Sequence, residues 1–312
     1  MKALLHEKTK NMIAISSTLT LLIIIARIAF FTLLERKILS YSQIRKGPNK
    51  PRFIGVPQPA RDGVKLFTKE STKLTNANKI IFIASPLIAI ALAFILWLLP
   101  PTSASPYWFR FPVVLFLCVS RLTVYAIIAA GWSSNAKFSL LGALRRIAQT
   151  ISYEVRIALI LITALLIIKS LKLLLSSSSS FIFNIWLTLP PLALIWYRTT
   201  LAETNRSPYD LAEGERELVS GFNTEYRGPE FALIFIAEYM NIIFISALTR
   251  IIFLQQATPW TLSQLLKTII LATLFISSRA SFPRLRYDRL IIITWTSYLP
   301  TTLIIILILR GV

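Results

Sequence analysis

The 312-residue sequence contains a single cysteine, Cys118, and a single histidine, His6. A disulfide needs two cysteines, and zinc or iron–sulfur sites need several cysteine or histidine ligands. The chain therefore cannot build such sites by itself. Cys118 lies in an apolar run, which favours an inert core position over a reactive thiol. The sequence also lacks a glycine-rich phosphate loop, the usual signature of nucleotide binding.

Charged residues are scarce too, at 15% of the chain against 55% hydrophobic residues. Apolar runs of about 20 residues recur, and each is long enough to cross a hydrocarbon core of roughly 30 Å. Eight spans are predicted: about 11–33, 78–99, 112–130, 147–175, 181–200, 229–254, 260–278 and 290–310. The first run is too long for a cleaved signal peptide, so we expect it to remain as a helix. The sequence predicts an all-α polytopic membrane protein that forms one transmembrane domain over 1–312, with amphipathic segments in its links.

The formal charge of +20 follows this predicted topology. Four links share one side of the membrane: 34–77, 131–146, 201–228 and 279–289. They hold most of the Lys and Arg, whereas the opposite links hold only Arg110. This asymmetry is typical of basic links on the inner side and places both termini on the other side. The charge therefore indicates a membrane protein, with no nucleic acid as partner.

The first basic link has a turn-rich half and an amphipathic half. Prolines and glycines over 47–59 predict an extended segment. After Pro59, the apolar residues Val64, Leu66 and Phe67 alternate with charged ones, as in a short interfacial helix. Two interpretations stay open. The helix anchors the link to lipid headgroups, or it forms a wall for an amphipathic ligand or a docking surface.

Acidic residues are few and unevenly placed. Seven of the 14 Asp and Glu residues fall within 203–230. Carboxylates beside a bilayer are costly, so this concentration indicates a role with protons or a charged ligand. The sequence SPYD at 207–210 is typical of a helix start, so Asp210 has helix capping as an alternative role. Glu213 and Glu217 are four residues apart and share one helical face.

Two more acids, Glu154 and Glu238, fall inside predicted spans. An ionised carboxylate there costs about 2.5–3.5 kcal/mol on insertion scales. A carboxyl group that desolvation holds near neutrality binds and releases protons readily. A proton-carrying role is therefore predicted for both, with a structural pairing to an arginine or tyrosine as the alternative.

Five segments carry a resemblance to a known family: LLERKILSYSQIRKGPN, QPARDGVKLFTKE, GALRRIAQTISYEV, LAETNRSPYDLAEGERELVSGFN and RASFPRLRYDRL. From Glu35 to Leu290, their order and spacing resemble the subunit 1 family of mitochondrial NADH:ubiquinone oxidoreductase, respiratory complex I. The resemblance covers most of the chain, and its motifs are long and specific. It implies a multi-pass core subunit of the mitochondrial inner membrane, with its long basic links on the matrix side. Such a subunit forms the membrane-side part of the ubiquinone tunnel and couples quinone reduction to proton translocation.

The resemblance also implies partners and site residues. Ubiquinone would be the substrate. FMN and iron–sulfur clusters would belong to partner subunits of the peripheral arm, and other partners would be adjacent membrane-arm subunits and phospholipids such as cardiolipin. The acids implied in proton coupling are Glu154, Glu203, Glu213, Glu215, Glu217, Glu225 and Glu238. The residues implied in the quinone tunnel and its lining are Glu35, Arg36, Asp62, Arg206, Asp210, Phe222, Arg286 and Asp288. Because neighbouring carboxylates titrate as a group, we expect the acidic loop to convert quinone chemistry into proton movement through Glu203 and Glu154.

Seven arginines depart from the family pattern, which has serine or another small residue there: Arg61, Arg121, Arg146, Arg156, Arg198, Arg216 and Arg227. Arg121 and Arg156 lie in or near spans, where charge is expensive. Many invertebrate mitochondria read AGA and AGG codons as serine. We therefore hypothesise that these seven positions are serines in the protein as made, with genuine arginines paired to acids as the alternative.

Other function classes stay open from the residues alone. A stand-alone ion or solute transporter fits the intramembrane acids, but no inverted repeat is evident. A membrane subunit of a related energy-converting hydrogenase is nearer in kind. A purely structural anchor does not explain the intramembrane acids. Co-purification with a flavin and iron–sulfur assembly would separate these classes.

Overall fold

A computed structural model describes residues 2–50, 53–71, 75–100, 111–168, 185–210, 221–254 and 262–311. Within these ranges all regular structure is helical. The longer helices are α1 (Lys2–Ser42), α2 (Gln58–Thr68), α3 (Lys79–Trp97), α4 (Pro112–Ser133), α5 (Lys137–Ile168), α7 (Pro190–Glu203), α9 (Pro229–Phe253), α10 (Leu262–Ser281) and α12 (Leu299–Gly311). The shorter elements are η1 (Phe53–Gly55), α6 (Ile185–Thr188), η3 (Gly221–Asn223), α11 (Tyr287–Ile293) and the π-helical η4 (Thr294–Tyr298).

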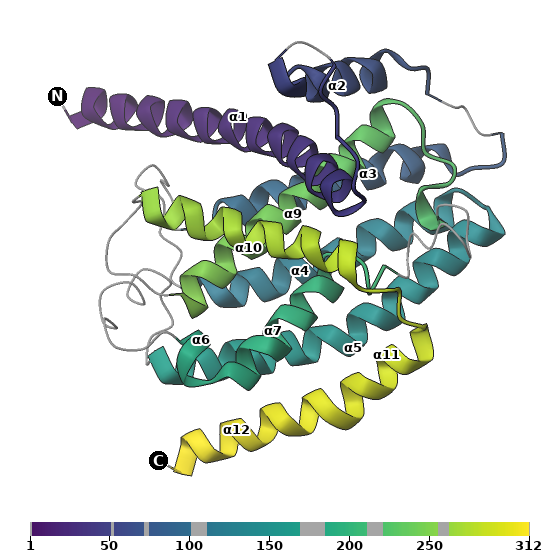
Figure 1. Cartoon of the computed structure of the whole chain (residues 1–312). Helices are drawn as coiled ribbons and strands as arrows, with labels where there is room; N and C mark the ends of the chain where they lie inside the picture. The colour runs from purple at the N-terminus through teal and green to yellow at the C-terminus, as the bar shows by residue number, and fades with distance from the viewer. Residues whose placement is uncertain are drawn as a thin grey trace.

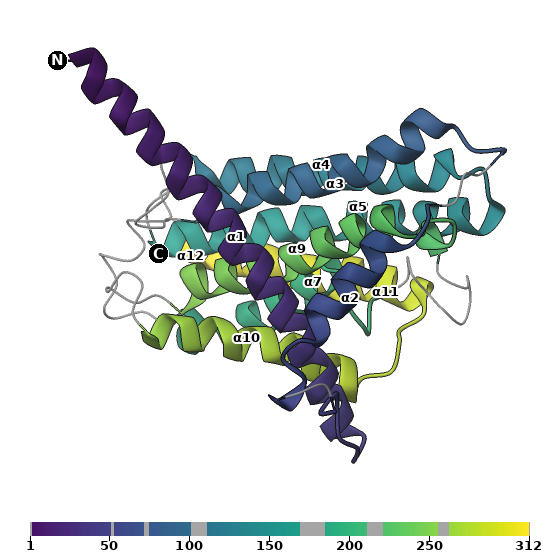
Figure 2. The ribbon, with the colours of Figure 1, turned by 90° about the horizontal axis from the view of Figure 1, so that it is seen from above.

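Six helical stretches among the described residues are long and apolar enough to cross a membrane: Thr18–Ser42, Lys79–Trp97, Pro112–Ser133, Lys137–Ile168, Pro229–Phe253 and Tyr287–Gly311. The prediction of an all-α polytopic membrane protein is confirmed. The apolar runs predicted at 181–200 and 260–278 coincide with α6–α7 and with α10. The predicted total of eight spans stays a prediction. Both chain ends lie on the same side of the bundle (Figures 1 and 2), which agrees with an even number of crossings.

Helix α9 lies at the centre of the packing. It contacts α3 and α10 extensively, and α3 in turn packs on α4, which packs on α5. Trp196 of α7 is buried against α9, where its ring stacks on Phe253 and its Nε1 donates to Oγ1 of Thr249 at 3.0 Å. Helices α1 and α12 lie at opposite edges of the bundle (Figure 1). Elements far apart in sequence therefore meet around α9.

The outer surface of the bundle is strongly apolar. Leu307 and Ile308 on α12 are 69% and 61% exposed, and Leu22 on α1 is 67% exposed. Exposed apolar area of this extent is expected where a helix faces lipid tails rather than water. Some polar and charged residues are nevertheless buried inside the bundle, among them Glu35, Gln149 and Arg156.

Gly228 determines how α2 is held against the bundle. Its φ of +63° is unfavourable for other residues, and a Cβ there would lie 2.7 Å from the carbonyl oxygen of Lys69. Only glycine lets the chain after α2 approach the start of α9 this closely. The end of α2 is thus fixed beside α9.

The segment 204–210 after α7 is held by three parts of the fold. The backbone N–H of Leu285 donates to the carbonyl of Pro208 at 3.0 Å. Gln149 of α5 donates to the carbonyls of Ala202 and Tyr209 at 2.9 and 3.0 Å. The helix predicted to start at Ser207 is wrong over 207–210, where the backbone forms a turn and a bend; residues 211–220 lie outside the described residues. The segment is therefore a fixed junction between α5, α7 and the chain before α11.

Candidate functional site

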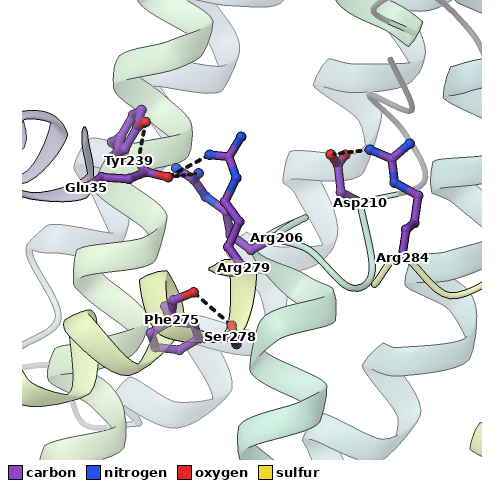
Figure 3. Close-up of polar contacts among 8 residues, drawn as sticks. All are labelled: Glu35, Arg206, Asp210, Tyr239, Phe275, Ser278, Arg279 and Arg284. Carbon is purple, nitrogen blue, oxygen red and sulfur yellow. Dashed lines mark hydrogen bonds and ion pairs between the residues drawn. The ribbon is translucent and has the colours of Figure 1, made fainter. Parts of the chain in front are cut away.

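The first part of the site is a buried charge cluster around Glu35 of α1, which is 4% exposed. Nη1 of Arg206 and Nη1 of Arg279 each lie 2.7 Å from the same oxygen, Oε1. Tyr239 of α9 donates its hydroxyl to the other oxygen, Oε2, at 2.6 Å. Figure 3 shows the three side chains converging on Glu35 from separate segments. We call these four residues the Glu35 cluster.

The Glu35 cluster carries one excess positive charge, because two guanidinium groups face one carboxylate. The guanidinium of Arg206 also lies 4.8 Å from the centre of the Tyr239 ring, within cation–π range. Burial by itself lowers the pKa of Arg206, but the charges of Glu35, Tyr239 and Glu238 outweigh it and raise that pKa. Arg206 therefore stays charged and interacts electrostatically with Glu35 and with Glu238.

Two neighbouring ion pairs extend this region. Nη1 of Arg36 lies 2.5 Å from Oδ2 of Asp62, and Gln58 donates to Oδ1 of Asp62 at 3.0 Å. These contacts join α2 to the end of α1. Nη2 of Arg284 lies 3.2 Å from Oδ2 of Asp210. Figure 3 shows these two side chains facing each other. Asp210 thus ties the end of segment 204–210 to the chain before α11.

The second part of the site is an internal cavity of about 60 Å³ between α3, α4, α5, α7 and α9. Glu203 and Glu238 border it, together with Asn205 and Asn241. Within the described residues, Oε2 of Glu203 and the Oδ1 atoms of both asparagines are buried without a hydrogen-bond partner. A buried water needs roughly 10–15 Å³ by this measure and two to four polar partners. The cavity has both the volume and the polar atoms for several waters.

Glu203 lies at the end of α7 and borders this cavity. Burial raises its pKa, the charge of Arg146 opposes that rise, and the charge of Glu154 adds to it. Glu203 keeps some accessible surface because it borders the cavity. Arg146 donates to the carbonyls of Ala202 and Glu203 at 3.1 and 2.8 Å, as a cation at a helix C-terminus does. The site thus holds a carboxyl group that retains its proton more readily than usual.

Glu154 lies on α5 in a partly buried position. Its Oε2 is 3.4 Å from Nε of Arg121 on α4. Because the charge of Glu154 raises the pKa of Glu203, the two acids interact electrostatically. Proton movement through Glu203 and Glu154 stays a prediction.

The remaining predicted residues lie in different surroundings. Phe222 is 1% exposed and borders the same cavity. Arg286 and Asp288 pair with each other at 3.2 Å on the exposed surface, and Glu225 is partly buried and does not border the described cavity. Three predicted acids lie outside the described residues: Glu213, Glu215 and Glu217. The described part of the site therefore consists of the Glu35 cluster and the cavity acids.

Sequence reasoning missed Tyr239, Arg279 and Asn241. Arg279 stands in the quoted RASFPRLRYDRL motif, and Asn241 is a polar residue three positions after Glu238 in an apolar run. That spacing places Asn241 and Glu238 on one helical face, a signal that the sequence offers. Among the described residues, no group of three His, Cys, Asp or Glu side chains is placed to hold a metal ion.

The arginines that depart from the family pattern have mixed surroundings. Arg156 is 1% exposed inside α5, with its guanidinium 4.3 Å from the centre of the Tyr153 ring and its Nε donating to the Ser152 carbonyl at 2.9 Å. Arg198 donates to the Tyr298 hydroxyl at 2.7 Å. The serine hypothesis stays a prediction. A tryptic peptide that runs uncut through position 156 would support it, and cleavage there would contradict it.

Comparison with known proteins gives a consistent result. A family model described as NADH dehydrogenase matches residues 15–310. The chain is 46% identical over 295 residues to NADH-ubiquinone oxidoreductase chain 1 of Paracentrotus lividus, covering 90% of this chain and 89% of the relative. The chain 1 proteins of Papio hamadryas and Aedes aegypti are 46% and 45% identical over 305 and 302 residues, with 93% and 96% of this chain and 95% of each relative covered. This chain therefore belongs to the NADH dehydrogenase family, as its motifs predicted.

Proposed function

We propose that the chain is a core membrane subunit of respiratory complex I in the mitochondrial inner membrane. In this role it forms the membrane-side part of the ubiquinone tunnel and couples quinone reduction to proton translocation. The relatives named NADH-ubiquinone oxidoreductase chain 1 support the subunit assignment. One observation supports the proposed coupling between quinone reduction and proton translocation. Glu203 borders the cavity, while Arg206, three residues later, belongs to the Glu35 cluster.

The segment 203–206 connects the two parts of the site mechanically. Thr204 and Asn205 border the cavity, so a displacement of Arg206 moves atoms that face Glu238. Protonation of Glu35 would remove the negative charge that Arg206 and Arg279 share. The two guanidinium groups would then repel each other, and segment 204–210 would shift. A local charge change at the quinone side thus reaches the proton-carrying acids.

The proposed proton path starts at Glu203, passes through the cavity and reaches Glu238. Glu154 tunes Glu203 through its charge. The other acids of the loop are proposed to supply protons from the matrix side: Glu213, Glu215, Glu217 and Glu225. Several such carboxyl groups would titrate together rather than singly.

Ubiquinone is the proposed substrate, with its headgroup approaching the Glu35 cluster from the α1–α2 side. The redox groups, FMN and iron–sulfur clusters, are assigned to partner subunits of the peripheral arm. Other membrane-arm subunits would cover part of the exposed apolar surface. We propose that the basic links face the matrix, and their excess of Lys and Arg supports this orientation.

Glu35→Gln in the assembled complex tests the tunnel assignment. Leaving a largely buried cation such as Arg206 without its carboxylate costs about 3–5 kcal/mol in typical cases. We expect the KM for ubiquinone to rise by roughly tenfold or more and the inhibitor-sensitive NADH:ubiquinone activity to fall. Flavin content reports assembly. The matched control is Glu70→Gln, an exposed acid outside the cluster. An assembled Glu35→Gln complex with wild-type KM and kcat would show that the cluster does not face the quinone.

A further inference from the structure

Two asparagines border the internal cavity with amide oxygens that lack a donor. Within the described residues, Oδ1 of Asn205 and Oδ1 of Asn241 are buried without a hydrogen-bond partner, as is Oε2 of Glu203. Asn205 is 9% exposed, and Asn241 is partly buried on α9. A buried acceptor without a donor is costly, so such atoms are rare in folded proteins. These oxygens therefore indicate a donor other than the side chains around them.

The hydroxyl groups around the cavity are engaged elsewhere. Ser120, Thr123 and Thr204 border it, and each donates to a backbone carbonyl three or four residues earlier, at 3.1, 2.6 and 3.0 Å. A hydroxyl group has one proton to donate, so these side chains cannot donate to the asparagine oxygens as well. Water is the donor that fits, because the cavity of about 60 Å³ exceeds the roughly 10–15 Å³ that one water needs.

Asn205 also has a backbone role, which is separable from that of its amide. Its φ is +53°, and the N–H of Arg206 donates to the Leu201 carbonyl at 3.2 Å, a common way to end a helix. Asn135, after α4, has a φ of +54°, and its amide donates to the Asn76 carbonyl at 3.2 Å on the exposed surface. The helix end thus explains an asparagine at both positions. It does not explain an unpartnered amide oxygen at the cavity, which only Asn205 of this pair has.

We propose that Asn205 and Asn241 are positioning residues for the waters that carry protons between Glu203 and Glu238. Each amide oxygen accepts from a water in the cavity and so fixes how that water is oriented. Asn205 lies two residues after Glu203, and Asn241 shares one helical face with Glu238. Each acid thus has a positioning residue beside it in sequence, and neither amide titrates. This role rests on the proposed proton path through the cavity.

Asn205→Gly in the assembled complex removes the amide and keeps the helix end, because glycine adopts the left-handed conformation readily. The complex is reconstituted in sealed vesicles, and protons translocated per electron are measured together with the KM for ubiquinone. We expect the proton ratio to fall severalfold and the KM to stay at the wild-type value, since the Glu35 cluster contains no part of this amide. Asn135→Gly is the matched control: it removes an amide from the same backbone conformation away from the cavity lining, and should change neither value.

Asn241→Leu removes the second amide at nearly the same side-chain size and should also lower the proton ratio. Asn241→Ser keeps an oxygen at the cavity and leaves room for a further water, so it should retain most of the ratio. Flavin content reports assembly, and Asn205→Gly alone decides if Asn241→Leu does not assemble. An equal loss in the leucine and serine variants would overturn the role of Asn241, because packing rather than water would then explain the loss.

A wild-type proton ratio in Asn205→Gly would overturn the proposal. A reduced ratio in Glu203→Gln, measured beside it, would then show that the proton path itself stands. A raised KM with an unchanged ratio in Asn205→Gly would overturn the proposal too, because Asn205 would then act only through the position of Arg206. A wild-type ratio in Glu203→Gln would overturn the proton path, and the positioning role with it.

Discussion

Glu35 shows how much a single residue depends on distant parts of the chain. Its oxygens accept from Arg206, Arg279 and Tyr239, which are 171, 244 and 204 positions away in sequence. A buried carboxylate without such partners would be strongly destabilised. The cluster therefore joins α1, α9, α10 and segment 204–210 at one point. Neutralising Glu35, or removing a side chain that donates to it, should affect all four of these parts of the fold.

Tyr239→Phe removes one donor and leaves the rest of the cluster in place. The ring that faces Arg206 is kept, while Oε2 of Glu35 loses its 2.6 Å hydroxyl contact. Hydrogen bonds to charged groups contribute about 1.5–3 kcal/mol, so we expect kcat/KM for ubiquinone to fall by roughly tenfold or more. Tyr226→Phe is the control: its hydroxyl is 2.8 Å from Oγ of Ser85, outside the cluster. Equal kinetics for the two variants would contradict a special role for Tyr239.

The raised pKa of Glu203 predicts a pH effect with a definite sign. Burial favours its protonated form, so its contribution to stability is full below the ordinary pKa of 4.5 and is lost as pH rises through the raised value. Glu203→Gln cannot ionise and should lose less stability over that range. The measurement is the Tm of the assembled complex from about pH 5.5 to 8.5. Asp288→Asn, an exposed acid, serves as control, and parallel Tm curves for wild type and Glu203→Gln would disprove the assignment.

Sequence reasoning reached part of this residue-scale picture. Glu35, Arg206 and Glu203 stand in long motifs, and Glu238 stands out as an acid in an apolar run. The partners Tyr239 and Arg279 could not be predicted, because their contacts with Glu35 depend on how α1, α9 and α10 pack. Tyrosine and arginine are also common at membrane interfaces, so their type alone indicates no function.

At the scale of elements, the apolar runs predicted helices well. In lipid, a spanning segment must satisfy its own backbone hydrogen bonds, and a helix does so. Boundaries were less predictable. α1 continues as helix to Ser42, past the predicted end of its apolar run at 33, and so carries Glu35 and Arg36 on a helix. The run predicted at 181–200 has Pro190 as the first residue of α7, a position where proline is well tolerated. The π-helical turn at 294–298 had no signal in the sequence.

Gly228→Ala should release α2 from the start of α9. The new Cβ would lie 2.7 Å from the Lys69 carbonyl, and the backbone conformation is one that alanine adopts at a cost of about 1–3 kcal/mol. We expect faster limited proteolysis at Lys65 and Lys69 in the assembled complex. Gly63→Ala is the control, since a Cβ there meets nothing within 4 Å. Unchanged proteolysis in Gly228→Ala would show that α2 is held by its ion pair to α1 instead.

At the scale of the whole molecule, the described residues form a helical bundle with an apolar outside and two connected polar regions inside. The Glu35 cluster lies where α1, α9 and α10 meet, and the cavity lies between α3, α4, α5, α7 and α9. Segment 203–206 takes part in both. This arrangement suits a subunit that transmits a charge change from the quinone side to acids within the membrane.

The number of protons translocated per electron by Glu203→Gln tests this central claim most directly. Complexes carrying Glu203→Gln, Glu154→Gln or the exposed control Glu70→Gln are reconstituted in sealed vesicles, and proton uptake is measured together with NADH oxidation. We expect the ratio to fall severalfold in Glu203→Gln, because glutamine cannot exchange a proton on the proposed path. The ratio should also fall in Glu154→Gln, because the charge that tunes Glu203 is lost. Glu70→Gln should keep the wild-type ratio. Full proton translocation and full quinone reductase activity in both Glu203→Gln and Glu154→Gln would contradict coupling through these acids.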